Sequence, residues 1–324
     1  MPWTSVVPVL VWLVLFLPFS YLMIRYPIRN RVSYILMFLA FAASNLYAVQ
    51  VINFVVVNYW LRLLPVIVLV ISLARFIMLP AHKRWLPSRD LGDSQLPIAL
   101  SLVLILLSIV PNAVALRSYN FSESPYGMPV LVQWPVQTGL YVIVNGGNGL
   151  EGLGMNDGYK DFLGRETRPS AYRAYETDIM EMTARGMVGD LGFFPSRADG
   201  YVGFVDHEPV YAPCIGRVVY VEDGHPDLQP NQPPQSDLGN RVVLQCFEYY
   251  VTVANLRNGT IPVREGQRVS LNNQLGQLGN SGTPSIPHLK VFATVGSWNE
   301  LGSPVLINFE YNYTVRNMLY IGQK

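Results

Sequence analysis

The sequence has few charged residues, and this shortage limits the classes of protein to which it can belong. Only 14% of the 324 residues are charged and 50% are hydrophobic, whereas about a quarter of residues are charged in ordinary soluble proteins. The net charge is +1, and no basic run with interleaved aromatic residues suggests a nucleic-acid partner. The composition therefore favours a membrane protein over a soluble or nucleic-acid-binding one.

Cysteine is also scarce, since it occurs only at Cys214 and Cys246. No CxxC pair or Cys/His cluster is present, which excludes a zinc site made of thiolates. The two cysteines flank a predicted hairpin with strands near 217–221 and 241–244, and folding would bring its outer ends together. A disulfide is geometrically plausible, but two unpaired, buried thiols are equally compatible with the sequence.

Four long hydrophobic runs lie in the first part of the chain, and none of them contains Asp or Glu. A helix that crosses a bilayer needs about 20 mostly apolar residues. A proton relay is not expected without acidic residues in the membrane. Asn45 and Asn53 are spaced to share one helix face, where hydrogen bonding between helices is expected rather than a transport path. The predicted spans are 4–24, 33–57, 59–79 and 97–116, within a region 1–116.

Basic residues between the runs predict the orientation of the helices. The first run has no basic segment before it and is followed directly by arginines, so it is interpreted as a retained anchor rather than a signal peptide. Basic loops stay in the cytoplasm, so four spans place both termini and everything after the fourth span outside it. The basic residues that follow the first and third runs are Arg25, Arg29, Arg31, Arg75, Lys83, Arg84 and Arg89, and Arg62 alone follows the second.

After residue 116 the sequence changes to short apolar runs separated by glycine, proline and asparagine. Residues 117–134 are interpreted as a linker and first strand, and 135–324 as one domain. Periodicity predicts a helix at 170–187, and the proline-rich segment 227–237 is predicted to be a loop. β-Branched and aromatic residues between turn residues predict strands at 131–134, 140–144, 209–212, 217–221, 241–245 and 249–254.

Closely spaced glycines between 263 and 282 predict very short strands joined by tight turns, because glycine permits the positive φ that such turns need. A further strand carrying a single histidine, His288, is predicted at 287–292. The segment 209–290 contains the ordered blocks Pro-Val-Tyr-Ala-Pro at 209–213, Gly-Asn-Arg-Val-Val-Leu at 239–244, Ala-Asn-Leu at 254–256, Val-Arg-Glu-Gly-Gln-Arg-Val at 263–269, Gly-Asn-Ser-Gly at 279–282 and Pro-His-Leu-Lys at 287–290. In this order the blocks resemble the lysostaphin-type (LytM-like) zinc endopeptidases.

The resemblance covers about 135–295, and residues 141–148 resemble the opening of a membrane-anchored branch of the family. It implies a mainly antiparallel β domain of the LytM type (a duplicated hybrid motif), which follows the predicted four-helix transmembrane region. Together with the predicted spans and their orientation, it indicates a multi-pass protein of the bacterial plasma membrane, with both termini and the C-terminal domain extracytoplasmic.

Members of this family cut peptide cross-links of the bacterial cell wall with one zinc ion. Two His and one Asp hold the zinc, a water completes the site, and two further His assist. Such a site needs three ligands and an open position, so that zinc lowers the pKa of its water towards ~7. The resemblance carries the Asp ligand loosely to Asp178 and one assisting His to His288.

The chain departs from this pattern at the remaining positions. The second zinc-binding His is replaced by Lys290, and the other assisting His by Asn255. The first zinc-binding His would fall at 156–158, where Asp157 lies. A protonated lysine has no lone pair to donate. No zinc and no catalytic residue are therefore expected, and Lys290 is expected to pair with Asp178 or Asp157.

Two classes of function follow from the resemblance. The first is a catalytically inactive metallopeptidase-like module, which binds or scaffolds in the cell envelope or serves as an accessory subunit of a membrane assembly. Its expected partners are the membrane, other envelope proteins or cell-wall peptide, and not nucleic acid. The alternative is an active zinc cell-wall endopeptidase with reassigned ligands, although His207 and His225 fall in predicted loops and are expected to be solvated.

Overall fold

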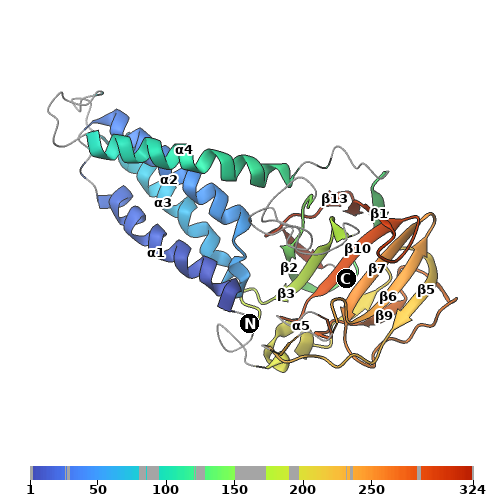
Figure 1. The fold of residues 1–324 in the computed structure, drawn as a ribbon. Coiled ribbons are helices and arrows are strands. Elements are labelled where there is room, and N and C mark those ends of the chain that lie inside the picture. The colour runs from blue at the N-terminus through green and yellow to red at the C-terminus, as the bar shows by residue number, and fades with distance from the viewer. Residues whose placement is uncertain are drawn as a thin grey trace.

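The computed structural model describes residues 3–25, 27, 30–79, 85, 95–119, 121, 128–149, 173–189, 197–230, 232–233, 236–282 and 286–322. It shows a bundle of helices joined end-on to a β domain (Figure 1). The helices of the bundle are α1 (Trp3–Arg25), α2 (Arg31–Val51), α3 (Leu64–Ile77) and α4 (Gln95–Arg117).

The four helical segments are long and apolar enough to cross a membrane: Val6–Arg25, Arg31–Val51, Tyr59–Ile77 and Ile98–Arg117. Their outward faces expose large apolar side chains, such as Val14 (69%) on α1 and Leu107 (68%) on α4. Such faces suit contact with lipid, because their side chains are apolar and the backbone polar groups of a helix are hydrogen-bonded within the helix. The expected hydrogen bond between helices is present, since Trp12 Nε1 donates to Asn45 Oδ1 at 3.0 Å.

The second helix ends earlier than predicted. It was expected to reach residue 57 but ends at Val51, and the 3₁₀ turns η1 (Phe54–Val56) and η2 (Tyr59–Leu63) follow before α3. All three residues of η1 are buried, in a cluster that they share with β-domain side chains. This contact competes with continuation of the helix, which an apolar run in the sequence does not reveal. Asn53 therefore lies beyond α2 and does not share a face with Asn45.

The β domain is mainly antiparallel. Its largest sheet has the order β14-β2-β3-β10-β7-β6-β5-β8, and β11 also pairs with β10. The strands predicted from the sequence are confirmed, and the described parts of 227–237 form neither helix nor strand. The strands are β1 (Val130–Val132), β2 (Gly139–Asn145), β3 (Thr177–Met182), β4 (Pro209–Tyr211), β5 (Gly216–Glu222), β6 (Asn240–Cys246), β7 (Tyr249–Leu256), β8 (Arg268–Val269), β9 (Gln274–Gln277), β10 (Leu289–Val295), β11 (Ser303–Val305), β12 (Ile307–Phe309), β13 (Asn312–Tyr313) and β14 (Leu319–Gly322).

The prediction of a helix at 170–187 is wrong over the described residues, where 177–182 form strand β3. Both faces of this strand are covered: Ile179 enters the domain core, while Met180 and Met182 pack in the cluster shared with the bundle. A strand that is buried on both faces lacks the polar alternation that normally identifies strands. Residues 170–172 lie outside the described part of the chain.

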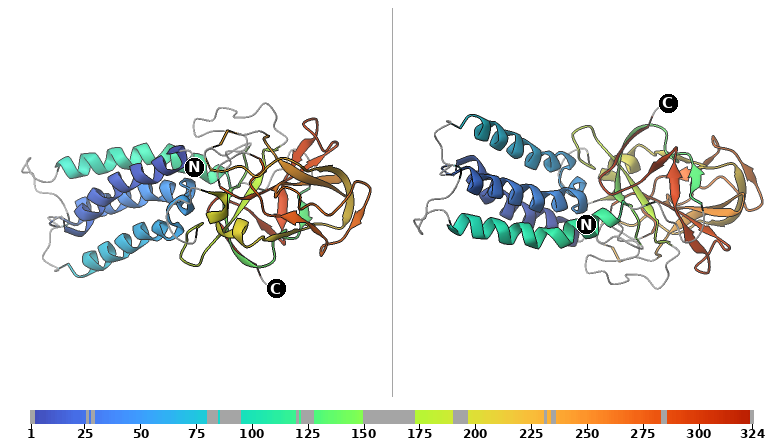
Figure 2. Two further views of the ribbon diagram at one scale, coloured as in Figure 1. Left: turned by 90° about the horizontal axis from the view of Figure 1, so that it is seen from below. Right: turned by 90° about the horizontal axis from the view of Figure 1, so that it is seen from above.

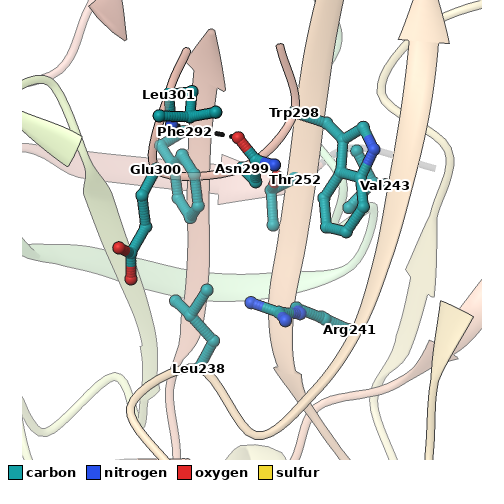
Figure 3. Close-up of a pocket in the computed structure, with 9 residues that line it drawn as sticks. All are labelled: Leu238, Arg241, Val243, Thr252, Phe292, Trp298, Asn299, Glu300 and Leu301. Carbon is teal, nitrogen blue, oxygen red and sulfur yellow. Dashed lines mark hydrogen bonds between the residues drawn. The ribbon is translucent and has the colours of Figure 1, made fainter. Parts of the chain in front are cut away.

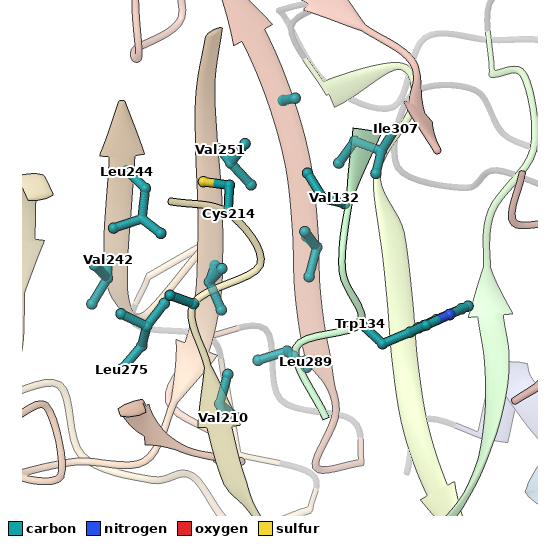
Figure 4. Close-up of a cluster of buried hydrophobic side chains, with 14 of the residues drawn as sticks. Val132, Trp134, Val210, Cys214, Val242, Leu244, Val251, Leu275, Leu289 and Ile307 are labelled. Atoms are coloured by element: carbon teal, nitrogen blue, oxygen red, sulfur yellow. The ribbon is translucent and has the colours of Figure 1, made fainter. Parts of the chain in front are cut away.

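The domain core lies on one face of the large sheet, and alternation along β10 shows which face it is. Leu289, Val291 and Ala293 belong to the core cluster, so Lys290 and Phe292 point to the opposite face. Figure 4 shows side chains from several strands converging in this core, among them Val132, Val210, Leu244, Val251, Leu289 and Ile307. Cys214 and Cys246 form a disulfide at its edge, with their Cα atoms 6.2 Å apart.

The opposite face of the sheet is divided between two surroundings. At β2 and β3 it packs against the 52–63 segment of the bundle, through side chains such as Val142 and Met180. At β10, β7 and β6 it carries the polar residues described below. The N-terminus of α1 lies beside the β domain, and the C-terminal ends of α1 and α3 lie at the far end of the bundle (Figures 1 and 2).

Candidate functional site

The face of the sheet opposite the core brings together residues from the centre of the sheet. Lys290 on β10 lies in register with Asp178 on β3 and with Ala254 on β7. Glu176 immediately precedes β3, and parity along that strand places Asp178 on the same face as Lys290. Pairing of distant strands therefore places these side chains together.

A cluster of charged side chains, all of them buried except Asp237, forms at this point. Lys290 Nζ lies 3.3 Å from Glu176 Oε1 and 3.5 Å from Asp178 Oδ2. The guanidinium of Arg173 pairs with Glu176 and with Asp237. Arg173 and Glu176 are fully buried, and Lys290 is 3% exposed. We refer to Arg173, Glu176, Asp178, Asp237 and Lys290 as the charge cluster.

The sequence predicted one contact of the charge cluster and missed the others. The contact between Lys290 and Asp178 is present, whereas Asp157, its other expected partner, lies outside the described residues. Arg173 and Glu176 were not predicted as site residues. The sequence carries no clear signal for them, because charged residues need partners only where they are buried, and the segment was predicted to be a helix.

The four buried charges of the cluster act on one another strongly because little water reaches them. Burial opposes ionisation of Glu176, yet Arg173 and Lys290 together hold its pKa below the ordinary value. Burial also opposes the charge on Lys290, but the two carboxylates raise its pKa above the usual range. Burial raises the pKa of Asp178 to about 7. Lys290 offsets only part of this rise, because its ammonium is shared with Glu176, and the negative charge on Glu176 raises the pKa of Asp178 further.

His288 lies beside the cluster as a neutral side chain. Its Nδ1 donates to the carbonyl oxygen of Ile286 at 2.6 Å, so its Nε2 carries the lone pair. Nε2 is 3.9 Å from Asp178 Oδ2, which is too long for a hydrogen bond. Burial, followed by the nearby charge on Lys290, lowers the pKa of His288 to about 3.

Asn255 has a structural role near the end of β7, the strand that pairs with β10. It lies in the left-handed region, with φ of 66°, a conformation that Asn tolerates better than most residues. Its side chain accepts from the backbone N–H of Gly282 at 2.7 Å and donates to the carbonyl of His288 at 2.6 Å. These bonds fix the turn before β10, so Asn255 positions the backbone beside the cluster.

The described residues do not fit a zinc site. Among them, no group of three or more His, Cys, Asp or Glu side chains is arranged to hold a metal ion. The ammonium of Lys290 lies within hydrogen-bonding distance of both nearby carboxylates, so a second cation would meet a positive charge there. His207 instead contacts Arg257, and His225 pairs with Glu222.

A pocket of about 390 Å³ opens on the same face, next to the charge cluster (Figure 3). Phe292 belongs to both places, since it lines the pocket and its ring lies 5.5 Å from Arg173 Cζ. The sequence did not predict this pocket, because its walls come from strands and loops that are far apart along the chain. Its lining residues are Leu238, Arg241, Val243, Thr252, Phe292, Trp298, Asn299, Glu300 and Leu301.

Comparison with solved structures finds peptidases of the M23, LytM and lysostaphin type, as partial likenesses at low sequence identity. A zinc-containing peptidase from Vibrio cholerae is 20% identical over 50% of this chain and 36% of its own, with a TM-score of 0.30. The catalytic domain of the prophage-encoded M23 protein EnpA from Enterococcus faecalis is 15% identical over 51% of this chain and 88% of its own, with a TM-score of 0.29. The catalytic domain of lysostaphin from Staphylococcus simulans is 16% identical over 40% of this chain and 74% of its own, with a TM-score of 0.25.

The chain thus spans about a third of the length of the first of these structures. No protein-family model matches the sequence, and no curated protein matches it.

Proposed function

We propose that the chain is a catalytically inactive, metallopeptidase-like module that is anchored in the membrane and binds its partners in the cell envelope. The ordered sequence blocks that resemble the LytM-like family support the metallopeptidase-like character of the domain. The single observation that carries the loss of activity is the position of Lys290, with its ammonium 3.3 Å from Glu176 and 3.5 Å from Asp178.

This lysine makes metal binding unfavourable for two reasons. A zinc ion needs electron-pair donors, and a protonated lysine offers none. The ammonium also lies beside Glu176 and Asp178, so a zinc ion there would meet a positive charge. Binding functions have no such requirement, because they depend on the shape and polarity of the same face.

The proposed location is the bacterial plasma membrane, with the β domain and both termini on the extracytoplasmic side. Arg25 and Arg31, at the ends of α1 and α2 far from the domain, support this orientation through the preference of basic residues for the cytoplasm. The disulfide between Cys214 and Cys246 agrees with an oxidising compartment.

Two kinds of partner fit a binding module of this kind: cell-wall peptide and another envelope or membrane protein. The junction between bundle and domain favours a role as an accessory subunit. Asn58 Nδ2 and Trp60 Nε1 each donate at 3.0 Å to carbonyls at 184–185 of the β domain. Because the bundle is fixed to the domain in this way, a movement of its helices against a membrane partner would also move the β domain.

The alternative, an active zinc endopeptidase with reassigned ligands, is favoured by one observation. His288 Nε2 and Asp178 Oδ1 are both buried and have no hydrogen-bond partner, so they retain lone pairs. In that case His288→Ala and chelators would each abolish wall hydrolysis.

The test uses the full chain purified in detergent. We expect less than stoichiometric zinc by elemental analysis and no release of peptide from purified cell wall. We also expect retention on cell wall or co-purification of an envelope protein. Stoichiometric zinc together with wall hydrolysis that His288→Ala removes would refute the proposal and establish the alternative.

A further inference from the structure

The pocket beside the charge cluster combines apolar walls with one cationic side chain. Figure 3 shows the guanidinium of Arg241 reaching into the space between Leu238, Phe292 and the indole of Trp298. Arg241 is the one basic residue among those that line the pocket. Its volume of about 390 Å³ lies within the range of small-ligand pockets, roughly 300–1,000 Å³. These features indicate a ligand with an apolar body and one anionic group.

The guanidinium of Arg241 is held in place before any ligand arrives. Its Nη2 lies 2.8 Å from Glu222 Oε2, and its Cζ lies 5.2 Å from the centroid of the Tyr220 ring. Trp298 stacks on Tyr220 with the ring centroids 4.5 Å apart, so the cation and the aromatic wall are fixed relative to each other. A guanidinium has five N–H donors. The carboxylate of Glu222 does not occupy all of them, so some remain for a second acceptor.

The polar groups of the pocket select the kind of anion. Thr252 on β7 is 2% exposed and brings a hydroxyl-bearing side chain into the pocket wall. Glu300 lines the opposite side and adds negative charge there, which repels a doubly charged anion such as a phosphate more strongly than a singly charged one. A single carboxylate matches one arginine, because the planar guanidinium fits a carboxylate well.

We propose that this pocket binds the free carboxyl terminus of a short peptide whose last side chain is apolar. Arg241 pairs with the terminal carboxylate, Thr252 bonds to the peptide, and Phe292, Trp298 and Leu301 surround the apolar side chain. The proposal rests on the proposed binding function and names the chemical class of its ligand.

The experiment titrates the full chain, in detergent, with acetylated Ala-Ala-Phe as the free acid and as the carboxyl-terminal amide, by calorimetry. We expect the acid to bind at least about tenfold more tightly than the amide, or about 1.4 kcal/mol. Arg241→Gln should remove this preference, and Arg241→Lys should restore part of it. The matched control is Arg268→Gln, which removes an exposed arginine on β8 and should leave both affinities unchanged.

Leu301→Ala provides a second variant with little risk to folding, because Leu301 is 87% exposed. Loss of its contact with the ligand should weaken acid and amide alike by at least about fourfold, the effect of one buried methylene group, because the substitution removes three carbon atoms. Equal binding of acid and amide, or an unchanged preference in Arg241→Gln, would overturn the proposal, as would no saturable binding of the acid.

These outcomes are separate from those that test the proposed function. If wall material or an envelope protein is retained while acid and amide bind equally, the carboxylate pocket is wrong and the binding module stands. If the acid binds with the expected preference but neither wall nor partner is retained, the pocket is supported and the proposed function fails.

Discussion

At the scale of single residues, the face of the sheet at β3 and β10 holds charges that lie almost out of contact with water. Glu176 is fully buried between Arg173 and Lys290, and Asp178 receives only a share of the positive charge of Lys290. Ionised side chains are tolerated in such a place only when their partners are present. The stability of the domain should therefore depend strongly on these few side chains.

Replacement of Lys290 by methionine should destabilise the β domain by about 3 to 5 kcal/mol, because it leaves buried carboxylates without their partner. Denaturant unfolding of the full chain, followed by tryptophan fluorescence, measures this loss. Adding Asp178→Asn to Lys290→Met should recover part of the stability. Arg217→Met, at an exposed position on β5, is the matched control and should have little effect. A loss no larger than that of the control would show that the charge cluster is not needed for folding.

Asp178 should also give stability a measurable pH dependence. Its pKa is about 7 in the folded chain, whereas an unfolded Asp titrates at about 3.9. The folded state thus binds the proton more tightly, so the contribution of Asp178 to stability falls as pH rises from about 4 to about 7. The difference in unfolding free energy between Asp178→Asn and the natural chain should therefore shift in favour of the variant over this range. A difference that does not vary with pH would mean that Asp178 is ionised throughout.

At the scale of elements, the sequence predicted most strands of the domain correctly. The predictions failed where contacts with other elements determine the type or the length of an element. Turn residues and β-branched residues identify β5, β6 and β7 locally. The strand β3 was mistaken for a helix because both of its faces are buried. The early end of α2 depends on contacts with residues more than two hundred positions away, such as Asn317. The pocket was missed for the same reason, whereas the pair of Lys290 and Asp178 could be predicted from matching blocks alone.

Asn317 should be a key residue of the junction between bundle and domain. Its Nδ2 lies 3.0–3.2 Å from three carbonyl oxygens at the end of α2, and its own carbonyl accepts from Tyr59 Oη at 2.9 Å. Asn317→Ala should speed hydrogen exchange at residues 52–63, since unpaired buried carbonyls cost about 1–3 kcal/mol. Asn317→Gly is the matched control for backbone strain, because φ is 65° and glycine tolerates that conformation. If glycine restores slow exchange, backbone conformation rather than side-chain bonding holds the junction.

At the scale of the whole molecule, the path of the chain through the bundle links membrane orientation to the position of the β domain. The helices begin and end so that the N-terminus and the β domain lie at the same end of the bundle (Figure 2). Trp85 lies at the other end, where its carbonyl accepts from the backbone N–H of Val32 at the start of α2. The proposed orientation in the membrane can therefore be tested at two positions, one at each end of the molecule.

Cysteines introduced at these ends should react differently in intact bacterial cells. Tyr311→Cys, at a position that is 83% exposed on the β domain, should be labelled by a membrane-impermeant maleimide. Trp85→Cys, at a position that is 60% exposed, should be labelled only after the membrane is permeabilised. The natural chain is the control, because Cys214 and Cys246 are joined in a disulfide and offer no thiol. Labelling of Trp85→Cys in intact cells, without labelling of Tyr311→Cys, would invert the orientation and place the β domain in the cytoplasm.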